Sequence, residues 1–238
     1  MWLAMDTATD RLSVALGTSG DEAEEESRDG ARRHAAALLP TIESLLRLRR
    51  ATLDDVRGLA LSDGPGSFTG LRVGASLVKA LVQSRGLPLW TAPSLLVRAA
   101  GAAREGGLVL AVSNALRGEV YAAAYRFHGS GIETVLPPTV QQPEALLGSR
   151  LAPDQLVGEA PAAIVALLER ELGRTMSGPP EGAPSGRALI GLIGRPGGAS
   201  RVERVQEWEP VYGRPAEAQA RWETAHGRAL PDSVGSSR

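Results

Sequence analysis

The stretch Asp63–Arg72, with the sequence DGPGSFTGLR, decides the fold. Its three glycines and one proline separate two apolar runs, so we predict a strand over Val56–Leu61 and a helix over Leu71–Ser84. A glycine-rich connection of this kind can hold a phosphate group, or it can seat the helix against neighbouring backbone. A Walker-type phosphate loop has Lys and then Ser or Thr after its last glycine, whereas Leu and Arg follow it here. We therefore favour the structural role, with a phosphate site as the alternative.

The predicted helix Leu71–Ser84 is apolar or small on almost every side. A surface helix normally has one apolar stripe, so this helix is expected to be buried on more than one face. The small residues Gly74, Ala75 and Ala80 would let a neighbouring backbone approach closely. One interpretation is that a second protein covers the outer face of the helix. The alternative is a central helix that its own domain covers entirely.

The segment Gly64–Gly74, GPGSFTGLRVG, resembles the signature of the bacterial TsaB family, also called YeaZ. The departure from the family pattern is at the end, where Gly213-Arg214 stands in place of the usual Leu-Arg. The resemblance covers about residues 1 to 215, although the part from about 141 to 205 carries almost no family signal. The other landmarks, in order, are the opening Met5–Thr9, the first helix from Arg33 to Pro40, the second-domain hairpin at Glu119–Tyr121 and the closing motif Glu209–Tyr212.

The resemblance implies an α/β protein with the actin-like ATPase (ribonuclease H-like) fold, built from two related α/β domains with mixed sheets. We place the first domain, with the glycine-rich turn and the partner-binding helices, at residues 1–103 and the second at residues 104–213. Residues 214–238 are expected to form a C-terminal tail, partly packed on the first domain and partly disordered.

The apolar periodicity and the turn residues predict the order of the elements. Met176–Gly186 is rich in Gly, Pro and Ser and is predicted to be a loop. Pro40 lies inside the first predicted helix and is expected to kink it. The predicted strands are Leu3–Asp6, Leu12–Leu16, Ala23–Ser27, Val56–Leu61, Leu87–Trp90, Leu108–Ser113, Glu119–Phe127, Ile132–Val140 and Gln155–Val157, and the predicted helices are Arg32–Arg50, Leu71–Ser84, Pro93–Ala103, Pro143–Leu147 and Ala160–Leu172.

The composition is that expected of a globular cytoplasmic protein. The chain has 238 residues, of which 43% are hydrophobic, enough for one large core or two modest ones. It contains no cysteine, which excludes disulfides and thiol catalysis. Asp6 ends the N-terminal apolar run well short of a signal peptide, and no membrane association is expected. With a net charge of −1, the chain is not expected to grip nucleic acid by itself.

Asp6 and Thr7 are the candidates for a nucleotide site. Actin-like kinases place an acidic residue and small turn residues after the first strand, next to the phosphates of ATP, and these two residues occupy that place. The same residue types are common in ordinary tight turns. A second phosphate turn should follow Ser113, yet no carboxylate occurs there before Glu119. An ATPase or small-molecule kinase acting through Asp6 is therefore kept as the alternative function.

The histidines give no indication of a metal site. His34, His128 and His226 are not spaced to share one face of a helix. In the catalytic relative TsaD, a metal-binding pair of histidines follows the strand that corresponds to Leu87–Trp90, and this chain has TAPSLLV there. We therefore expect no metal, no cofactor and no catalytic residue.

The resemblance implies a non-catalytic scaffold or activator of a TsaD-like threonylcarbamoyltransferase. That reaction forms threonylcarbamoyladenosine next to the anticodon of tRNA. The implied partners are the TsaD-like metal-binding paralogue, in a heterodimer, and a TsaE-like ATPase, and tRNA would be reached only through the complex. The chain alone is expected to be able to form a homodimer, because the uncovered helix face would otherwise be exposed.

In such pairs the first two helices of each subunit form a four-helix bundle. Arg72 lies in the first turn of its predicted helix, where the helix dipole disfavours a cation. Its guanidinium is expected either to bond to carbonyls or a carboxylate, or to stay solvated while its stem covers apolar surface. Ser67 or Thr69 is expected to cap the helix. The residues that we assign to the interface are His34, Leu38, Ile42, Arg72, Gly74, Ala75 and Val78.

Overall fold

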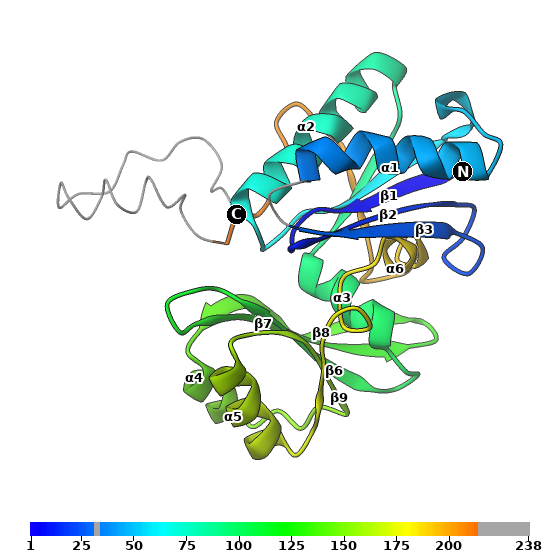
Figure 1. Ribbon diagram of the computed structural model, residues 1–238. Helices are drawn as coiled ribbons and strands as arrows, with labels where there is room; N and C mark the ends of the chain where they lie inside the picture. Colours follow the sequence, from blue (N-terminus) through cyan, green and yellow to red (C-terminus); the bar gives the residue numbers. More distant parts are fainter. Residues whose placement is uncertain (31–33, 214–238) are drawn as a thin grey trace.

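The computed structural model describes residues 1–30 and 34–213 (Figure 1). In this part of the chain the strands form two mixed sheets, with the orders β11-β5-β4-β1-β2-β3 and β10-β9-β6-β7-β8. The prediction of an α/β protein with two mixed sheets is thus confirmed. The strands are β1 (Trp2–Asp6), β2 (Arg11–Gly17), β3 (Glu24–Asp29), β4 (Gly58–Ser62), β5 (Leu89–Ala92), β6 (Leu108–Asn114), β7 (Val120–His128), β8 (Gly131–Gln141), β9 (Gln155–Glu159), β10 (Met176–Ser177) and β11 (Ser200–Val202). The helices are α1 (His34–Leu48), the 3-10 helix η2 (Leu53–Asp55), α2 (Phe68–Arg85), α3 (Ser94–Ala102), α4 (Pro143–Gly148), α5 (Ala162–Leu172) and α6 (Gly186–Gly191).

The first sheet is centred on β1, which pairs antiparallel with β2 and parallel with β4. Successive side chains of a strand point to opposite faces of its sheet. In β1 the large residues Leu3 and Met5 pack under α1 and α2, whereas Ala4 belongs to the core on the opposite face. Small residues on that opposite face let α6 come close, since a Cβ on Gly186 would lie 2.9 Å from the backbone nitrogen of Ala15.

The helices cover the sheets on three levels (Figure 1). The pair α1 and α2 lies on the outer face of the first sheet, and α3 and α6 lie between the two sheets. The outer face of the second sheet packs against α4 and α5 through Leu146 and Leu168. No helix among the described residues is both long and apolar enough to cross a membrane.

The chain returns to the first sheet near its end, which the sequence pattern did not reveal. β11 pairs antiparallel with β5, with Arg201 opposite Trp90. The predicted loop Met176–Gly186 is wrong at its two ends, because β10 pairs with β9 and α6 begins at Gly186. The division into domains at 103/104 and 213/214 stays a prediction. β11 lies within the predicted second domain but pairs with a strand of the first sheet. Residues 31–33 and the tail 214–238 lie outside the described residues.

The helix α2 begins three residues earlier than predicted because Ser67 caps it. The Ser67 hydroxyl accepts a hydrogen bond from the backbone N–H of Gly70 at 3.3 Å. At the other end Gly86 has φ of 66°, and its N–H donates to the carbonyl of Val82. Pro40 lies within α1 as expected, and its kink stays a prediction.

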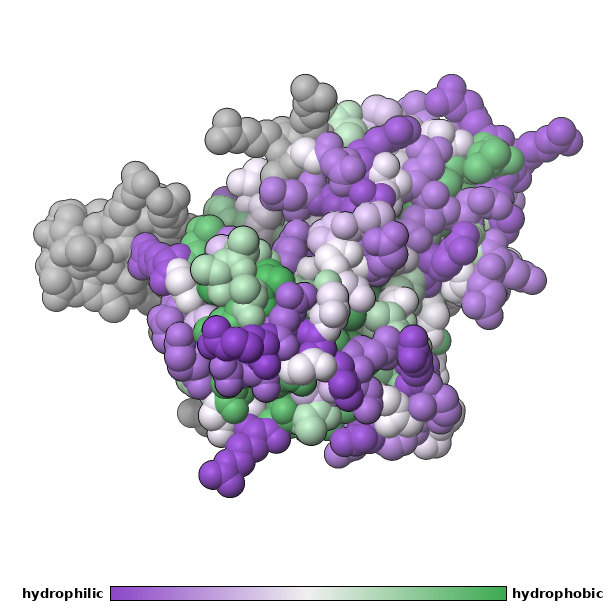
Figure 2. All heavy atoms as spheres, turned by 60° about the horizontal axis from the view of Figure 1, so that its bottom comes forward, coloured by the Kyte–Doolittle hydropathy of each residue, from purple (hydrophilic) through white to green (hydrophobic). Residues whose placement is uncertain are grey.

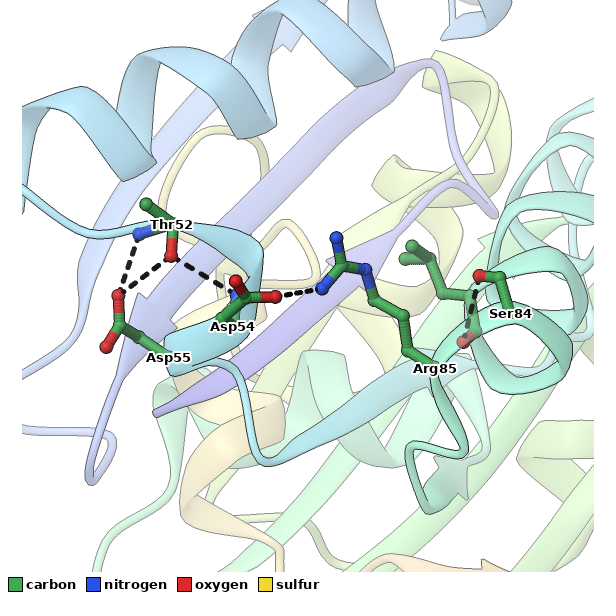
Figure 3. Close-up of polar contacts among 6 residues, drawn as sticks. Thr52, Asp54, Asp55, Ser84 and Arg85 are labelled. Carbon is green, nitrogen blue, oxygen red and sulfur yellow. Dashed lines mark hydrogen bonds and ion pairs between the residues drawn. The ribbon is translucent and has the colours of Figure 1, made fainter.

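Polar contacts fix the C-terminal end of α2 (Figure 3). Arg85, in the last turn, forms an ion pair with Asp54 of η2. The η2 turn is itself held by a capping box, in which the N–H of Thr52 donates to Asp55 at 2.8 Å and the N–H of Asp54 donates to the Thr52 hydroxyl at 3.3 Å. The C-terminal end of α2 is therefore held by the Gly86 cap and by the ion pair of Arg85 with Asp54.

We predict that Ser67→Ala lowers the free energy of unfolding by about 0.5 to 2 kcal/mol, since the first turn of α2 loses its side-chain acceptor. Urea denaturation measures the loss. Ser84→Ala is the matched control, because the Ser84 hydroxyl donates back to the carbonyls of Ala80 and Leu81 in the last turns of the same helix and caps no N–H group there. An equal effect of the two substitutions would contradict the capping role.

Candidate functional site

The glycine-rich segment lies directly on the turn that follows β1. A Cβ on Gly70 would lie 1.9 Å from the carbonyl oxygen of Thr7, and one on Gly66 would lie 2.3 Å from that of Ala8. The N–H of Ser67 donates to the Ala8 carbonyl at 2.7 Å. Side chains at these glycines would collide with backbone, which cannot move aside as a side chain can. The glycines therefore seat α2 against the β1–β2 turn, as the structural interpretation predicted.

Gly64 and Gly74 extend the same contact. Gly64 has φ of 107°, and a Cβ there would lie 2.0 Å from the carbonyl oxygen of Val211. A Cβ on Gly74 would lie 2.6 Å from the Thr7 hydroxyl and 2.8 Å from the Leu61 side chain. Gly74 thus faces the protein's own first sheet.

Asp6 and Thr7, the candidates for a nucleotide site, are enclosed by this packing. Both side chains are 0% exposed, and the N–H of Ala8 donates to Asp6 Oδ1 at 3.1 Å. Burial raises the pKa of Asp6 to about 6, partly offset by the Ser62 hydroxyl, the Ala8 N–H and the charge of Arg98. Asp6 thus accepts a hydrogen bond from the turn that follows β1, and no part of it is exposed to a ligand.

Asp63, at the start of the glycine-rich segment, is a second carboxyl group of this kind. Burial raises its pKa to about 6, and the hydroxyl of Thr91 partly offsets the effect. Burial also raises the pKa of Tyr125, with a further contribution from the charge of Asp63. Sequence inspection did not single out Asp63, because an aspartate before glycine is an ordinary turn residue.

A largely apolar groove lies between α1 and α2. Its volume is about 670 Å³. Leu39, at the centre of α1, is 56% exposed. The lining residues are Ala35, Leu38, Leu39, Phe68, Thr69, Arg72, Val73, Ser76 and Leu77.

Most of the residues assigned to the interface lie inside the protein. Those buried are His34, Leu38, Ile42, Gly74, Ala75 and Val78, and Leu38, Ile42 and Val78 belong to the core beneath the two helices. Only Arg72 is exposed. The interface stays a prediction, but in this fold the contacts would have to be made by exposed or half-buried neighbours such as Leu39, Val73 and Leu77.

Arg72 forms a contact that neither of its two interpretations anticipated. Its guanidinium lies over the ring of Phe68, 4.5 Å from the ring centroid. The Phe68 ring also packs against Tyr212, with the centroids 4.8 Å apart. A cation above an aromatic face is attracted by the ring quadrupole, which offsets the unfavourable helix dipole.

The closing motif runs along α2. Lys79 Nζ forms an ion pair with Glu209 at 2.6 Å and lies 5.9 Å from the centroid of the Trp208 ring. The N–H of Val211 donates to the carbonyl of Asp63 at 2.7 Å. One face of α2 is therefore covered by residues 208–212, one by the first sheet, and the groove face stays open.

The buried carboxyl groups predict a pH dependence of stability. Their pKa values are raised from 3.8 to about 6, so between about pH 4 and 6 the folded protein holds more protons than the unfolded chain. Their contribution to the free energy of unfolding is therefore full at low pH and is lost as the pH rises through 6.

Asp6→Asn tests this dependence, because asparagine keeps the acceptor for the Ala8 N–H and carries no charge. Relative to the wild type, the variant is expected to gain up to about 3 kcal/mol of stability between pH 4 and pH 7.5. Urea denaturation at both pH values measures this difference. A constant difference would mean that Asp6 ionises as easily in the folded protein as in the unfolded chain.

Comparison with known proteins gives the family. A family model described as "TsaD: tRNA N6-adenosine threonylcarbamoyltransferase" matches residues 27–173, more than half of the chain. "tRNA threonylcarbamoyladenosine biosynthesis protein TsaB" of Escherichia coli (strain K12) is 37% identical over 146 residues, which cover 58% of this chain and 63% of that protein. The protein of the same name from Bacillus subtilis (strain 168) is 31% identical over 135 residues, 57% of this chain and 59% of that protein. The matched part thus spans about three fifths of the length of these relatives.

Solved structures agree on the architecture. "YeaZ from Pseudomonas aeruginosa" superposes with a TM-score of 0.66 at 26% identity, covering 81% of this chain and 90% of that one. A protein described as having "similarity to peptidase YEAZ from Pseudomonas aeruginosa" gives a TM-score of 0.71 at 27% identity, covering 90% of this chain and 99% of that one. The fold is therefore the actin-like, ribonuclease H-like fold that the sequence predicted. The chain belongs to the family that the TsaD model describes and, within it, to the TsaB proteins, also called YeaZ, of tRNA threonylcarbamoyladenosine biosynthesis.

Proposed function

We propose that this chain is a non-catalytic scaffold for a TsaD-like threonylcarbamoyltransferase, and that it binds this partner through the groove between α1 and α2. The observation that carries the proposal is the groove itself, an apolar hollow of about 670 Å³ on the helix pair. Apolar surface of this kind, with a charged residue such as Arg72 at its rim, is typical of protein interfaces. The name TsaD of the matching family model supports the choice of partner.

The enclosure of Asp6 supports a non-catalytic role. A group that takes part in phosphoryl chemistry has to reach the substrate, and Asp6 is 0% exposed. The alternative function, an ATPase or kinase acting through Asp6, has no observation in its favour. ATP turnover by the isolated chain that survives repurification and is lost in Asp6→Asn would restore it.

The remaining parts of the proposal concern the assembly. We place the complex in the cytoplasm, with a TsaE-like ATPase as a further member and with tRNA bound by the complex as a whole. The product would be threonylcarbamoyladenosine next to the anticodon. When the partner is absent, the same groove would favour a homodimer, because exposed apolar surface is reduced by self-association.

The groove predicts a separation of binding from folding. Leu39→Glu places a charge on an exposed apolar position of α1 that lines the groove. The Kd for the TsaD-like paralogue is therefore expected to rise about tenfold or more. The melting temperature of the free chain should change little, since Leu39 is 56% exposed. Isothermal titration with the purified paralogue measures the affinity.

Leu48→Glu is the control for this substitution. Leu48 is the last residue of α1, is 62% exposed and does not line the groove. Leu48→Glu should leave the Kd for the TsaD-like paralogue unchanged. Equal Kd values for Leu39→Glu and the wild type would place the interface elsewhere, and failure of the wild type to bind at all would remove the proposed function.

A further inference from the structure

The turn between β6 and β7 has an unusual backbone. Leu116, Arg117 and Gly118 have φ values of 64°, 54° and 79°, so three successive residues are left-handed. The turn is closed by three hydrogen bonds. The N–H of Leu116 donates to Asn114 Oδ1 at 2.9 Å, the N–H of Glu119 donates to the Leu116 carbonyl at 2.9 Å, and the N–H of Ala115 donates to the Glu119 carbonyl at 3.0 Å. The backbone is therefore well defined at an exposed tip.

Leucine is a poor residue for this conformation. Left-handed positions in tight hairpin turns are normally filled by Gly, Asn or Asp, because a Cβ with a bulky side chain comes close to the following carbonyl. Asparagine at 116 would adopt the same backbone with less strain. The turn therefore stores free energy that a simpler sequence would avoid.

The same residue is also exposed. Leu116 is 68% exposed. Among the described residues, the other large apolar side chains that are exposed are those of Leu39, Leu48 and Val211, each of them less exposed than Leu116. A single exposed leucine needs no explanation. A leucine that is both exposed and held in a strained backbone has two costs and no benefit in the free chain, which points to a contact made with another molecule.

The strand that follows the turn is linked to the groove through the closing residues of the described chain. Tyr121, near the start of β7, lies against Gly213. A Cβ on Gly213 would be 2.7 Å from the Tyr121 ring and 2.8 Å from the side chain of Pro65. Tyr212, the preceding residue, packs on Phe68 of the groove. A short chain of contacts thus links the start of β7 to the N-terminal end of α2.

In Figure 1 the connection between β6 and β7 and the N-terminal end of α2 lie toward the same side of the molecule. Figure 2 shows a largely hydrophilic surface (purple) with apolar residues (green) at several places. Val211, which is 56% exposed, directly precedes Tyr212, the residue that packs on Phe68 of the groove.

We propose that Leu116 and Arg117 form a second contact with the same TsaD-like partner, on the β6–β7 turn of the second sheet. Leu116 would enter an apolar depression on the partner, and Arg117, which is also exposed, would face a carboxylate at its rim. The interface would then extend from the helix groove across Val211 to the second sheet. This inference rests on the proposed function and on the continuity of this surface with the groove.

The test is the substitution Leu116→Asn, which should have opposite effects on stability and binding. The melting temperature of the free chain is expected to stay the same or rise, because asparagine suits a left-handed turn. The Kd for the full-length paralogue is expected to rise about fivefold or more. Leu48→Asn is the matched control, an equally exposed leucine on α1 that should leave the Kd unchanged. Leu116→Gly is the second variant, since glycine also fits the backbone and removes the side chain.

Each outcome decides the inference. If Leu39→Glu weakens the complex and both Leu116 variants bind as tightly as the wild type, the second contact is overturned and the proposed function stands. If the Leu116 variants change only the self-association of the chain, measured by sedimentation without the paralogue, the occupant is a second copy and the inference is wrong. If the wild type does not bind the paralogue, the proposed function and this inference fail together.

Discussion

The contact between the glycine-rich segment and the β1–β2 turn is the constraint on which the rest of the structure depends. Gly66 and Gly70 approach the carbonyls of Ala8 and Thr7 so closely that no side chain fits between them. This contact fixes where α2 begins and how it lies on the sheet, and α1 and the closing motif then pack against α2. Backbone cannot yield as a flexible side chain can, so the position of α2 is set by geometry more than by the strength of any one bond.

The same packing explains why a turn suited to a ligand serves structure here. Asp6 ends the first strand and Thr7 follows it, yet both are fully buried, and the backbone of the glycine segment lies against Thr7 and Ala8. In this position α2 packs one face against the first sheet, where its apolar side chains join the core. Residues 208–212 cover a second face, and the face next to α1 lines the apolar groove. The candidate groove is thus a consequence of the way in which the glycine-rich segment places α2.

Sequence patterns predicted much of the fold and little of the site. The order of strands and helices up to α5 follows from periodicity, and the role of the glycines follows from their spacing, but α6 and β11 lie in a segment whose glycines and prolines conceal them. Periodicity shows that α2 is apolar on several sides without showing which side its own sheet takes, so Ala75 and Val78 were assigned to a partner and lie in the core. Nothing in the letters Leu-Arg-Gly indicates a left-handed turn, because the usual Asn-Gly signal is absent at Leu116.

Hydrogen–deuterium exchange of the chain, alone and bound to its TsaD-like paralogue, tests the central claim most directly. The account predicts that complex formation slows exchange in residues 35–39, 68–77 and 114–119, the three segments that carry the groove and the β6–β7 turn. It predicts little change in α5 or at the outer strand β3 of the first sheet. Protection confined to α5 or β3, with exchange in the groove segments unaltered, would contradict the account.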